Sequence, residues 1–342
     1  MKISAKVGKF AAVVLAVGVG ASLLAGCSSS SEQATEVTEL TIYSGRSEEF
    51  IAPFFDQWQA ESGIKLNIRY GDSAELAAQI LEEGKNSPAD LFLSQDAGSL
   101  GAVAAADLFT TLPDGVATSI PATYIAAKRQ WVGVTGRARV FAYSPTLKTL
   151  PQSVTDLTSP AYKGILGIAP SNSSFQAFVT ALINAEGEAA AEKWLKGLKS
   201  NGVKIYAKNS GIVEAIDKGE IQIGLVNHYY IWEVSEGLGR EIKVKNGFFR
   251  AGDIGNLINV SGAGVLASSK KYSAAEDLIN FLTSQKVQED FVSKTHEYSL
   301  LAGATSPAGL PTLLEIGAPT IDLEALKNIS VTQDLLVKVG LL

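Results

Sequence analysis

Leu40-Thr41-Ile42-Tyr43-Ser44 is an apolar run that ends at Gly45, and it opens the segment that decides the fold. A helical pattern over residues 47–61 follows, and residues 64–70 then alternate apolar and polar side chains as a second strand does. A helical stripe over residues 73–81 leads to a third strand, Leu91-Phe92-Leu93-Ser94. This alternation predicts an α/β fold with a parallel sheet that carries helices on both faces.

The alternation of predicted strands and helices is repeated further along the chain. Residues 164–169 and 203–206 have the pattern of strands, and residues 174–184, 187–197 and 212–218 have the pattern of helices. Ser273 and Glu276 have the spacing of a capping box, which predicts that another helix begins there. The mature chain of about 310 residues is long enough for two such domains.

Residues 1–26 have the composition of a secretion signal. Three lysines precede an apolar run from Phe10 to Leu24, which is too short and too rich in glycine for a good membrane span. The run ends Leu24-Ala25-Gly26-Cys27, and four serines follow, a pattern that resembles the lipobox of a bacterial lipoprotein. We expect cleavage before Cys27, lipid attachment to its sulfur, a flexible tether over residues 27–39, and an extracytoplasmic location at the cell membrane. The alternative is an ordinary signal peptide that contains a cysteine.

Composition narrows the function classes. Cys27 is the only cysteine, so the mature domain has no disulfide, no cysteine–metal cluster and no thiol nucleophile. Cleavage would remove three lysines and no acid, and the formal net charge would move from −6 to −9. An acidic exported chain argues against nucleic acid as a partner. We expect a monomer that meets the membrane through its lipid.

Asn227-His228-Tyr229-Tyr230 follows the apolar strand of residues 221–226. On a continuing strand the two phenol rings would point to opposite faces, whereas in the first turn of a helix they are about 100° apart and can reach one cleft. A phenolate is a hard oxygen donor, and Fe(III) can displace its proton at neutral pH. The alternative is that both rings pack in a core or form the wall of a sugar site. We expect His228 to flank this turn and not to be a ligand.

Other polar residues have the positions and the chemistry of an anion site. Arg46, Ser47 and Gln95 follow predicted strands, where ligands of parallel sheets bind. Arg137 and Arg139 precede the next predicted strand, and they can hold a carboxylate, phosphate or carbonate or make ion pairs. Asn172-Ser173-Ser174 opens a predicted helix, whose amides can bind an anion, although capping that helix would also explain these residue types.

Catalytic motifs are scarce. The two histidines, His228 and His296, are not spaced as a metal pair and lack the neighbours that mark a triad. The sequence contains no nucleophile elbow, phosphate loop or dinucleotide fingerprint. We therefore do not expect an enzyme.

Five segments, taken together and in order, resemble the bacterial ferric-ion-binding proteins, which are periplasmic components of iron ABC transporters. The resemblance runs from about Leu40 to about Leu310 and implies a type 2 solute-binding fold, in which two α/β lobes joined by crossing strands close around a ligand. It implies a first lobe of residues 40–139 plus 262–312 and a second lobe of residues 140–261 plus 313–342. The segments are residues 43–48, 87–92, 132–140, 207–210 and 227–230.

The resemblance also implies roles for individual residues. Tyr229 and Tyr230 match the paired phenolate ligands of Fe(III), and Arg46 matches a first-loop variant of relatives that pair iron with carbonate-like anions. A synergistic anion is held in some members at positions that match Asn172, Ser173, Ser174, Asn209 and Asn227.

Three positions depart from the pattern of some members. Ser47 replaces a histidine, Gln95 replaces a glutamate, and Phe175 is the nearest match to a third tyrosine. With only two matched protein ligands, we expect a site that depends on carbonate, bicarbonate or a similar anion, held by Arg46 with Arg139 as a further candidate.

The resemblance implies that the captured iron is delivered to an ABC permease in the membrane. Free Fe(III) and a chelate such as ferric citrate both remain open as the ligand. The rival reading is a solute-binding protein for a small organic anion, such as a phosphonate or carboxylate, in which the arginines bind and the tyrosines are walls. An enzyme of the same architecture and a structural adhesin are less well supported.

Overall fold

The computed structural model describes residues 37–342. The predicted signal peptide, Cys27 and most of the predicted tether lie outside these described residues. The last residue of the predicted tether, Glu39, is the first residue of a strand.

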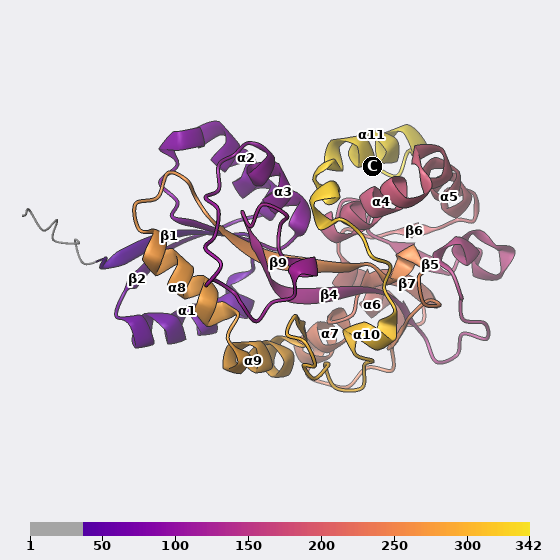
Figure 1. Cartoon of the computed structure of the whole chain (residues 1–342). Coiled ribbons are helices and arrows are strands. Elements are labelled where there is room, and N and C mark those ends of the chain that lie inside the picture. The colour runs from indigo at the N-terminus through magenta and orange to yellow at the C-terminus, as the bar shows by residue number, and fades with distance from the viewer. Residues whose placement is uncertain (1–36) are drawn as a thin grey trace, which may run out of the picture. The chain divides into compact units, whose positions relative to one another are not determined.

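The first part of the chain folds as the sequence pattern predicts (Figure 1). Its elements are β1 (Glu39–Ser44), α1 (Glu48–Ser62), β2 (Lys65–Tyr70), α2 (Ser73–Glu83), β3 (Leu91–Ser94) and α3 (Ala97–Ala105). The strands lie in the order β2-β1-β3 and run parallel. Helix α1 buries Ile51, Phe54, Phe55 and Trp58, which recur at helical spacing along one face.

Two long strands, β4 (Val132–Tyr143) and β9 (Ile258–Val265), lie at the centre of the sheet. They run antiparallel to each other, and β9 also runs antiparallel to β3. The predicted parallel arrangement is confirmed for β1, β2 and β3, and it does not extend to β4 and β9. The sheet as a whole is therefore mixed, with parallel strands on both sides of an antiparallel centre.

Strand β4 changes partner along its length. Its residues up to Ala138 pair with β9, and its residues from Arg139 to Tyr143 pair with β7 (Ile223–Asn227). One strand is thus shared by two groups of strands and helices, which lie to the left and right of it in Figure 1. Arg137 and Arg139 lie inside β4 and not before it, which corrects the predicted boundary.

The second group repeats the strand–helix alternation. Its strands β7, β5 and β6 are parallel, as predicted, and β8 is antiparallel to β4. Its further elements are β5 (Leu166–Ile168), α4 (Ser173–Glu186), α5 (Glu188–Ser200), β6 (Lys204–Ile205), α6 (Asn209–Asp217), α7 (Tyr230–Leu238) and β8 (Lys245–Gly247).

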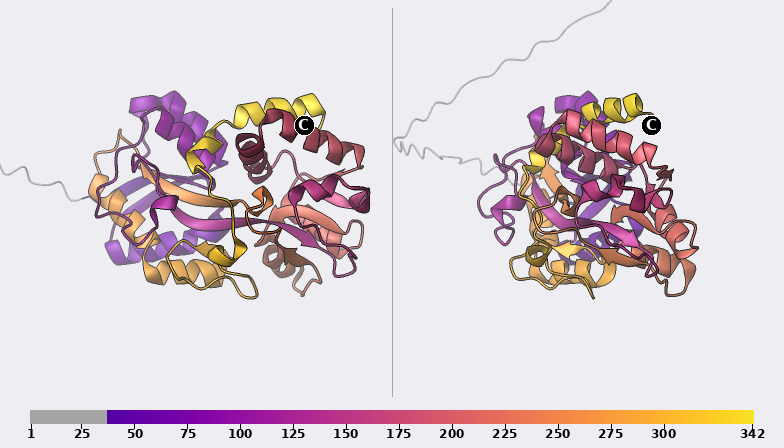
Figure 2. Two further views of the ribbon diagram at one scale, coloured as in Figure 1. Left: turned by 45° about the vertical axis from the view of Figure 1, so that its right-hand side comes forward. Right: turned by 90° about the vertical axis from the view of Figure 1, so that its right-hand side faces the viewer.

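The end of the chain returns to both groups (Figures 1 and 2). It forms α8 (Tyr272–Leu282), α9 (Gln285–Thr295), β10 (Tyr298–Ser299), α10 (Leu313–Ile316), the 3-10 turn η6 (Leu323–Lys327) and α11 (Ile329–Val339). Turn η6 packs on α3, and α11 packs on α4 and α5. A side chain at Gly98 of α3 would come within 2.8 Å of the Leu326 carbonyl oxygen, so the close approach requires glycine.

One predicted helix start is wrong. Helix α8 begins at Tyr272, and no side chain caps it, so Ser273 lies inside the first turn and makes no capping box with Glu276. The remaining 3-10 turns are η1 (Gly84–Asn86), η2 (Ala122–Tyr124), η3 (Val154–Thr158), η4 (Pro160–Tyr162) and η5 (Ile254–Asn256). None of the helices within residues 37–342 combines the length and the apolar character that crossing a membrane requires.

Candidate functional site

The tyrosine pair lies where β7 turns into α7. Tyr229 has helical backbone angles (φ −74°, ψ −16°), and α7 begins at Tyr230, which confirms that the pair lies at the first turn of a helix. The two ring centroids are 4.6 Å apart with 31° between the ring planes. Nδ2 of Asn227 lies 3.5 Å from the Tyr229 hydroxyl oxygen. Two phenol groups therefore lie side by side at the end of a buried strand.

Burial and neighbouring groups change the pKa of Tyr230. Burial raises the pKa of Tyr230 well above its ordinary value, and the adjacent Tyr229 and Glu233 raise that pKa further, whereas a hydrogen bond with Asn209 lowers it. The Tyr230 phenol is thus held protonated in the protein without ligand. A cation that binds here as a phenolate complex must displace that proton.

Residues from three other segments meet Tyr229 in one small pocket. Arg46 and Ser47 follow β1, and Gln95 follows β3. Thr295 is the last residue of α9, and Glu297 lies two residues beyond it. The pocket has room for about one water molecule, at about 10 Å³. Its lining also includes Phe50 of α1, whose ring packs edge-on against Tyr229 at 6.4 Å. The structure therefore brings together Arg46, Ser47, Gln95 and Tyr229, which are far apart in the sequence.

Arg46 is held by a carboxylate that the sequence does not mark. Its Nη1 and Nη2 atoms each lie 2.6 Å from an oxygen of Glu297, and both side chains are buried, with 4% and 3% exposed. Burial would raise the pKa of Glu297, but Arg46, together with Arg137, holds that pKa below its usual range. Both terminal nitrogens of Arg46 are therefore already bound by a carboxylate, and the pair is neutral.

Arg139 is also buried, but its hydrogen-bond partners are neutral groups. Its terminal nitrogens contact Ser174 Oγ at 3.1 Å, Asn227 Oδ1 at 3.4 Å and the Leu225 carbonyl at 3.0 Å, which are all neutral groups. Its Nε has no partner, and only 2% of the side chain is exposed. No carboxylate within residues 37–342 forms an ion pair with it. Burial lowers the pKa of Arg139 to about 9, and the neighbouring Tyr230 and Tyr229 oppose that change.

The predicted anion turn joins the same cluster. Asn172 caps α4, and its Oδ1 accepts from the Ser174 amide at 3.1 Å, from the Ser174 hydroxyl and from Asn209 Nδ2 at 3.1 Å. The capping role is thus confirmed. Asn209 Nδ2 also lies 3.2 Å from Ser174 Oγ, while its Oδ1 has no partner. Ser173 is the first residue of α4.

Arg137 lies in β4, opposite Asn259 of β9. It is buried, and its Nε and Nη2 atoms have no hydrogen-bond partner among the described residues. Its charge acts on two buried carboxyls, since it lowers the pKa of both Asp96 and Glu297. Burial nevertheless leaves the pKa of Asp96 above its usual value.

Both ring nitrogens of His228 have hydrogen-bond partners in the main chain. Its Nδ1 accepts from the Ala138 amide at 3.2 Å, and its Nε2 lies 2.7 Å from the His296 carbonyl oxygen. Burial lowers its pKa to about 4. Both ring nitrogens are engaged with the main chain.

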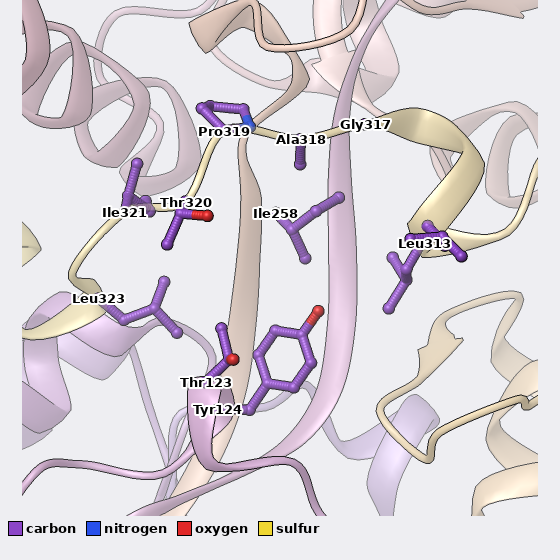
Figure 3. Close-up of a pocket in the computed structure, with 11 residues that line it drawn as sticks. Thr123, Tyr124, Ile258, Leu313, Gly317, Ala318, Pro319, Thr320, Ile321 and Leu323 are labelled. Atoms are coloured by element: carbon purple, nitrogen blue, oxygen red, sulfur yellow. The ribbon is translucent and has the colours of Figure 1, made fainter.

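Larger cavities lie elsewhere. One of about 200 Å³ lies beside α10, with Tyr124, Ile258, Leu313 and Thr320 around it (Figure 3). None of the described residues that line it carries a charge, and none is a predicted site residue. Within residues 37–342 there is also no group of three or more His, Cys, Asp or Glu side chains that could hold a metal.

The sequence analysis missed Phe50, Thr295 and Glu297. Glu297 has no local motif, and its partner Arg46 is 251 residues away. Phe175, the nearest match to a third tyrosine, is fully buried with its ring 5.6 Å from the Arg139 guanidinium carbon.

Two groups of strands and helices that share a long strand, with a polar cluster between them, define the class of extracellular solute-binding proteins. The family model described as "Bacterial extracellular solute-binding protein" matches residues 86–315. The "Fe(3+)-binding periplasmic protein" of Serratia marcescens is 33% identical over 308 residues, which is 89% of this chain and 90% of that protein.

Solved structures of similar proteins support the same class. Iron-bound HitA from Pseudomonas aeruginosa has a TM-score of 0.82 and 32% identity, with 89% of this chain and 99% of that chain covered. The Trichodesmium protein IdiA (FutA), in complex with iron and citrate ligands, has a TM-score of 0.76 and 26% identity, with 88% and 99% covered. The chain belongs to the family of bacterial ferric-ion-binding proteins, whose members are solute-binding proteins and not enzymes.

Proposed function

We propose that the protein captures ferric iron with the phenolates of Tyr229 and Tyr230, together with a synergistic anion, and delivers it to an ABC permease. The observation that carries this proposal is the buried guanidinium of Arg139, which has no acidic partner among residues 37–342 and lies among the residues around the two tyrosines. A buried charge is stable only when it is paired or neutralised. Two phenolates and an anion would supply that negative charge.

The charges explain why an anion is expected. Fe(III) with two phenolates keeps one positive charge, and Arg139 adds a second, whereas Arg46 and Glu297 cancel each other. A doubly charged oxyanion such as carbonate would neutralise the site. We assign Arg139, Ser174, Asn209 and Asn227 to its immediate surroundings, because these side chains already contact one another. The remaining residues of the proposed site are Arg46, Ser47, Gln95, Arg137, Asn172 and Ser173.

The relatives support iron as the solute. The names of the Serratia and Pseudomonas proteins state that they bind iron, and the Trichodesmium protein holds citrate as well as iron. Citrate is a carboxylate, so a chelated form of iron remains a ligand to be tested beside carbonate.

The cellular role follows from the same proposal. Lipid on Cys27 would hold the protein outside the cytoplasmic membrane as a monomer, with residues 28–38 as a tether. Lobes of residues 40–139 plus 262–312 and 140–261 plus 313–342 would close on the iron, since a ligand drives closure only by contacting both. Changing Cys27→Ser should move the protein from the membrane fraction to the soluble fraction, and retention in the membrane would contradict the anchor.

An optical titration tests the iron site. Fe(III) is added to the metal-free protein with and without bicarbonate. We expect a visible phenolate-to-iron charge-transfer band that is lost in Tyr229→Phe and Tyr230→Phe and weakened without bicarbonate. Tyr206→Phe, which changes a tyrosine outside the cluster, is the matched control and should keep the band.

The second candidate is a small organic anion as the solute. The partnerless nitrogens of Arg137 and Arg139 favour it, because they could bind a carboxylate or phosphonate directly. A colourless protein under all conditions, with calorimetric binding of such an anion, would establish this alternative and exclude the ferric site.

A further inference from the structure

The imidazole of His228 joins three segments that are distant in the sequence. His228 is the first residue after β7, and its ring is fully buried. Nδ1 accepts from the Ala138 amide, and the His228 amide donates to the Ala138 carbonyl at 3.1 Å. Ala138 is the residue of β4 at which the partner strand changes from β9 to β7. Ala138 pairs with Ile258 of β9, and its amide and carbonyl both bind His228.

The third segment is the end of α9. Nε2 of His228 lies 2.7 Å from the His296 carbonyl oxygen. A carbonyl can only accept, and the Ala138 amide can only donate, so the imidazole is neutral and carries its proton on Nε2. His296 has left-handed backbone angles (φ 56°), which are uncommon for a residue other than glycine. This conformation ends α9 where the His296 carbonyl meets His228.

The same ring contacts a proposed iron ligand. The His228 and Tyr229 rings meet edge-on, with their centroids 5.6 Å apart. The ring of Tyr298 in β10 also packs against the His228 ring, at 4.8 Å. The His228 carbonyl accepts from Asn246 Nδ2 at 2.8 Å. Residue 228 is therefore held at its amide, its ring and its carbonyl, directly before the tyrosines.

A second contact joins the same segments. The His296 ring stacks on Trp232 of α7 at 4.7 Å with 16° between the planes. The Trp232 amide donates to the Tyr229 carbonyl at 3.0 Å, so this stack touches the first turn of the helix that carries Tyr230. The two contacts differ in kind, because one uses the His296 main chain and the other uses its side chain.

We infer that His228 is a positioning residue for Tyr229 and Tyr230, and that its imidazole ties the tyrosine turn to β4 and to the end of α9. This inference rests on the proposed function for its iron-binding consequence. A loose turn would still offer two phenolates, but it would not hold both at one metal. Iron would then bind through the same ligands and leave faster.

Hydrogen–deuterium exchange of the whole protein tests the tie without iron. His228→Phe keeps a ring of similar size and removes both hydrogen-bonding atoms. We expect at least tenfold faster exchange in peptides that cover residues 136–140 and 228–232, with β1 and β2 unchanged. His228→Gln keeps one acceptor and one donor and should be intermediate. Unchanged exchange in both variants would overturn the inference.

His296→Gly separates the two contacts. It keeps the carbonyl that His228 uses, and glycine accepts the left-handed backbone, but it removes the ring that stacks on Trp232. We expect exchange in residues 136–140 to stay close to that of the unchanged protein. If it rises as much as in His228→Phe, the stack and not the imidazole ties the segments, and the inference is wrong.

Iron release gives the second readout. With iron loaded, His228→Phe should keep the position of the visible band, because both phenolates remain, and should lose iron to a competing chelator at least tenfold faster. Tyr229→Phe should instead lose the band. Release at the unchanged rate would contradict the positioning role. If the unchanged protein shows no band, the proposed ferric function fails, while the exchange experiment still decides whether His228 ties the segments.

Discussion

Arg139 and Asn227 lie opposite each other where β4 pairs with β7, and Nη1 of Arg139 is 3.4 Å from Oδ1 of Asn227. Asn227 is the last residue of β7, and only His228 separates it from the two tyrosines. The pairing of two strands therefore places a buried positive charge at the base of the tyrosine turn. A substitution that removes the charge of Arg139 is therefore the most direct test of the proposed anion site.

Arg139→Gln should remove most of the anion dependence. A hydrogen bond to a charged group contributes about 1.5–3 kcal/mol, so the affinity for Fe(III) in bicarbonate should fall by about 10- to 100-fold. Competition with a chelator, with and without bicarbonate, measures it. Arg69→Gln, at an exposed arginine of β2, is the control and should change neither value. A variant that still responds fully to bicarbonate would show that the anion lies elsewhere.

Glu297→Gln should destabilise the protein strongly. The change leaves Arg46 charged and buried with a neutral partner, and breaking a buried pair costs about 3–5 kcal/mol. Thermal or denaturant unfolding gives the free energy. Glu214→Gln breaks an exposed pair with Lys218 and should cost about 0.5 kcal/mol or less. Equal effects of the two changes would argue against a structural role for the buried pair.

The same pair predicts a pH dependence of stability. The pKa of Glu297 is lower in the folded than in the unfolded protein. Its contribution is therefore complete above the unfolded value of about 4.3 and is lost as the pH falls through the folded value. Between pH 7 and about pH 3, the free energy of unfolding should drop more steeply in the unchanged protein than in Glu297→Gln. Parallel curves for the two proteins would contradict this.

Iron affinity should fall as the pH is lowered. Burial raises the pKa of Tyr230, so its phenol is protonated in the metal-free protein and the metal must displace that proton. Release of two phenol protons would weaken the apparent affinity by up to about 100-fold for each pH unit. Titrations between pH 8 and pH 6 check this. An affinity that does not change over this range would exclude phenolate ligands.

Phe175→Tyr should not create a third iron ligand. Phe175 is fully buried and packs against Phe178 and the Arg139 guanidinium. A hydroxyl added there would lack a built-in partner and should cost about 1–3 kcal/mol of stability. The visible band should keep its position. A shifted or stronger band would show that this position reaches the metal. Phe109→Tyr, at another buried phenylalanine, controls for the cost of a buried hydroxyl.

Local patterns in the sequence were enough to predict the first strands and helices and the position of the tyrosine pair. The strands and helices of residues 39–105 agree with their hydrophobic periodicity, because neighbours in the chain decide which face of an element is apolar. Tyr229 and Tyr230 could be placed in a first helical turn because an apolar strand ends just before them. The order of five segments was enough to indicate the family.

Only the tertiary structure decided which of the predicted residues are free to act. Arg46 and Arg139 look alike in the sequence, yet Arg46 is neutralised by Glu297, 251 residues away, while no acidic side chain in the described part of the chain pairs with Arg139. The antiparallel course of β4 and β9, the change of partner at Ala138 and the two engaged nitrogens of His228 are likewise long-range. Contacts of this kind depend on how whole elements pack against one another, and no local pattern of residues encodes them.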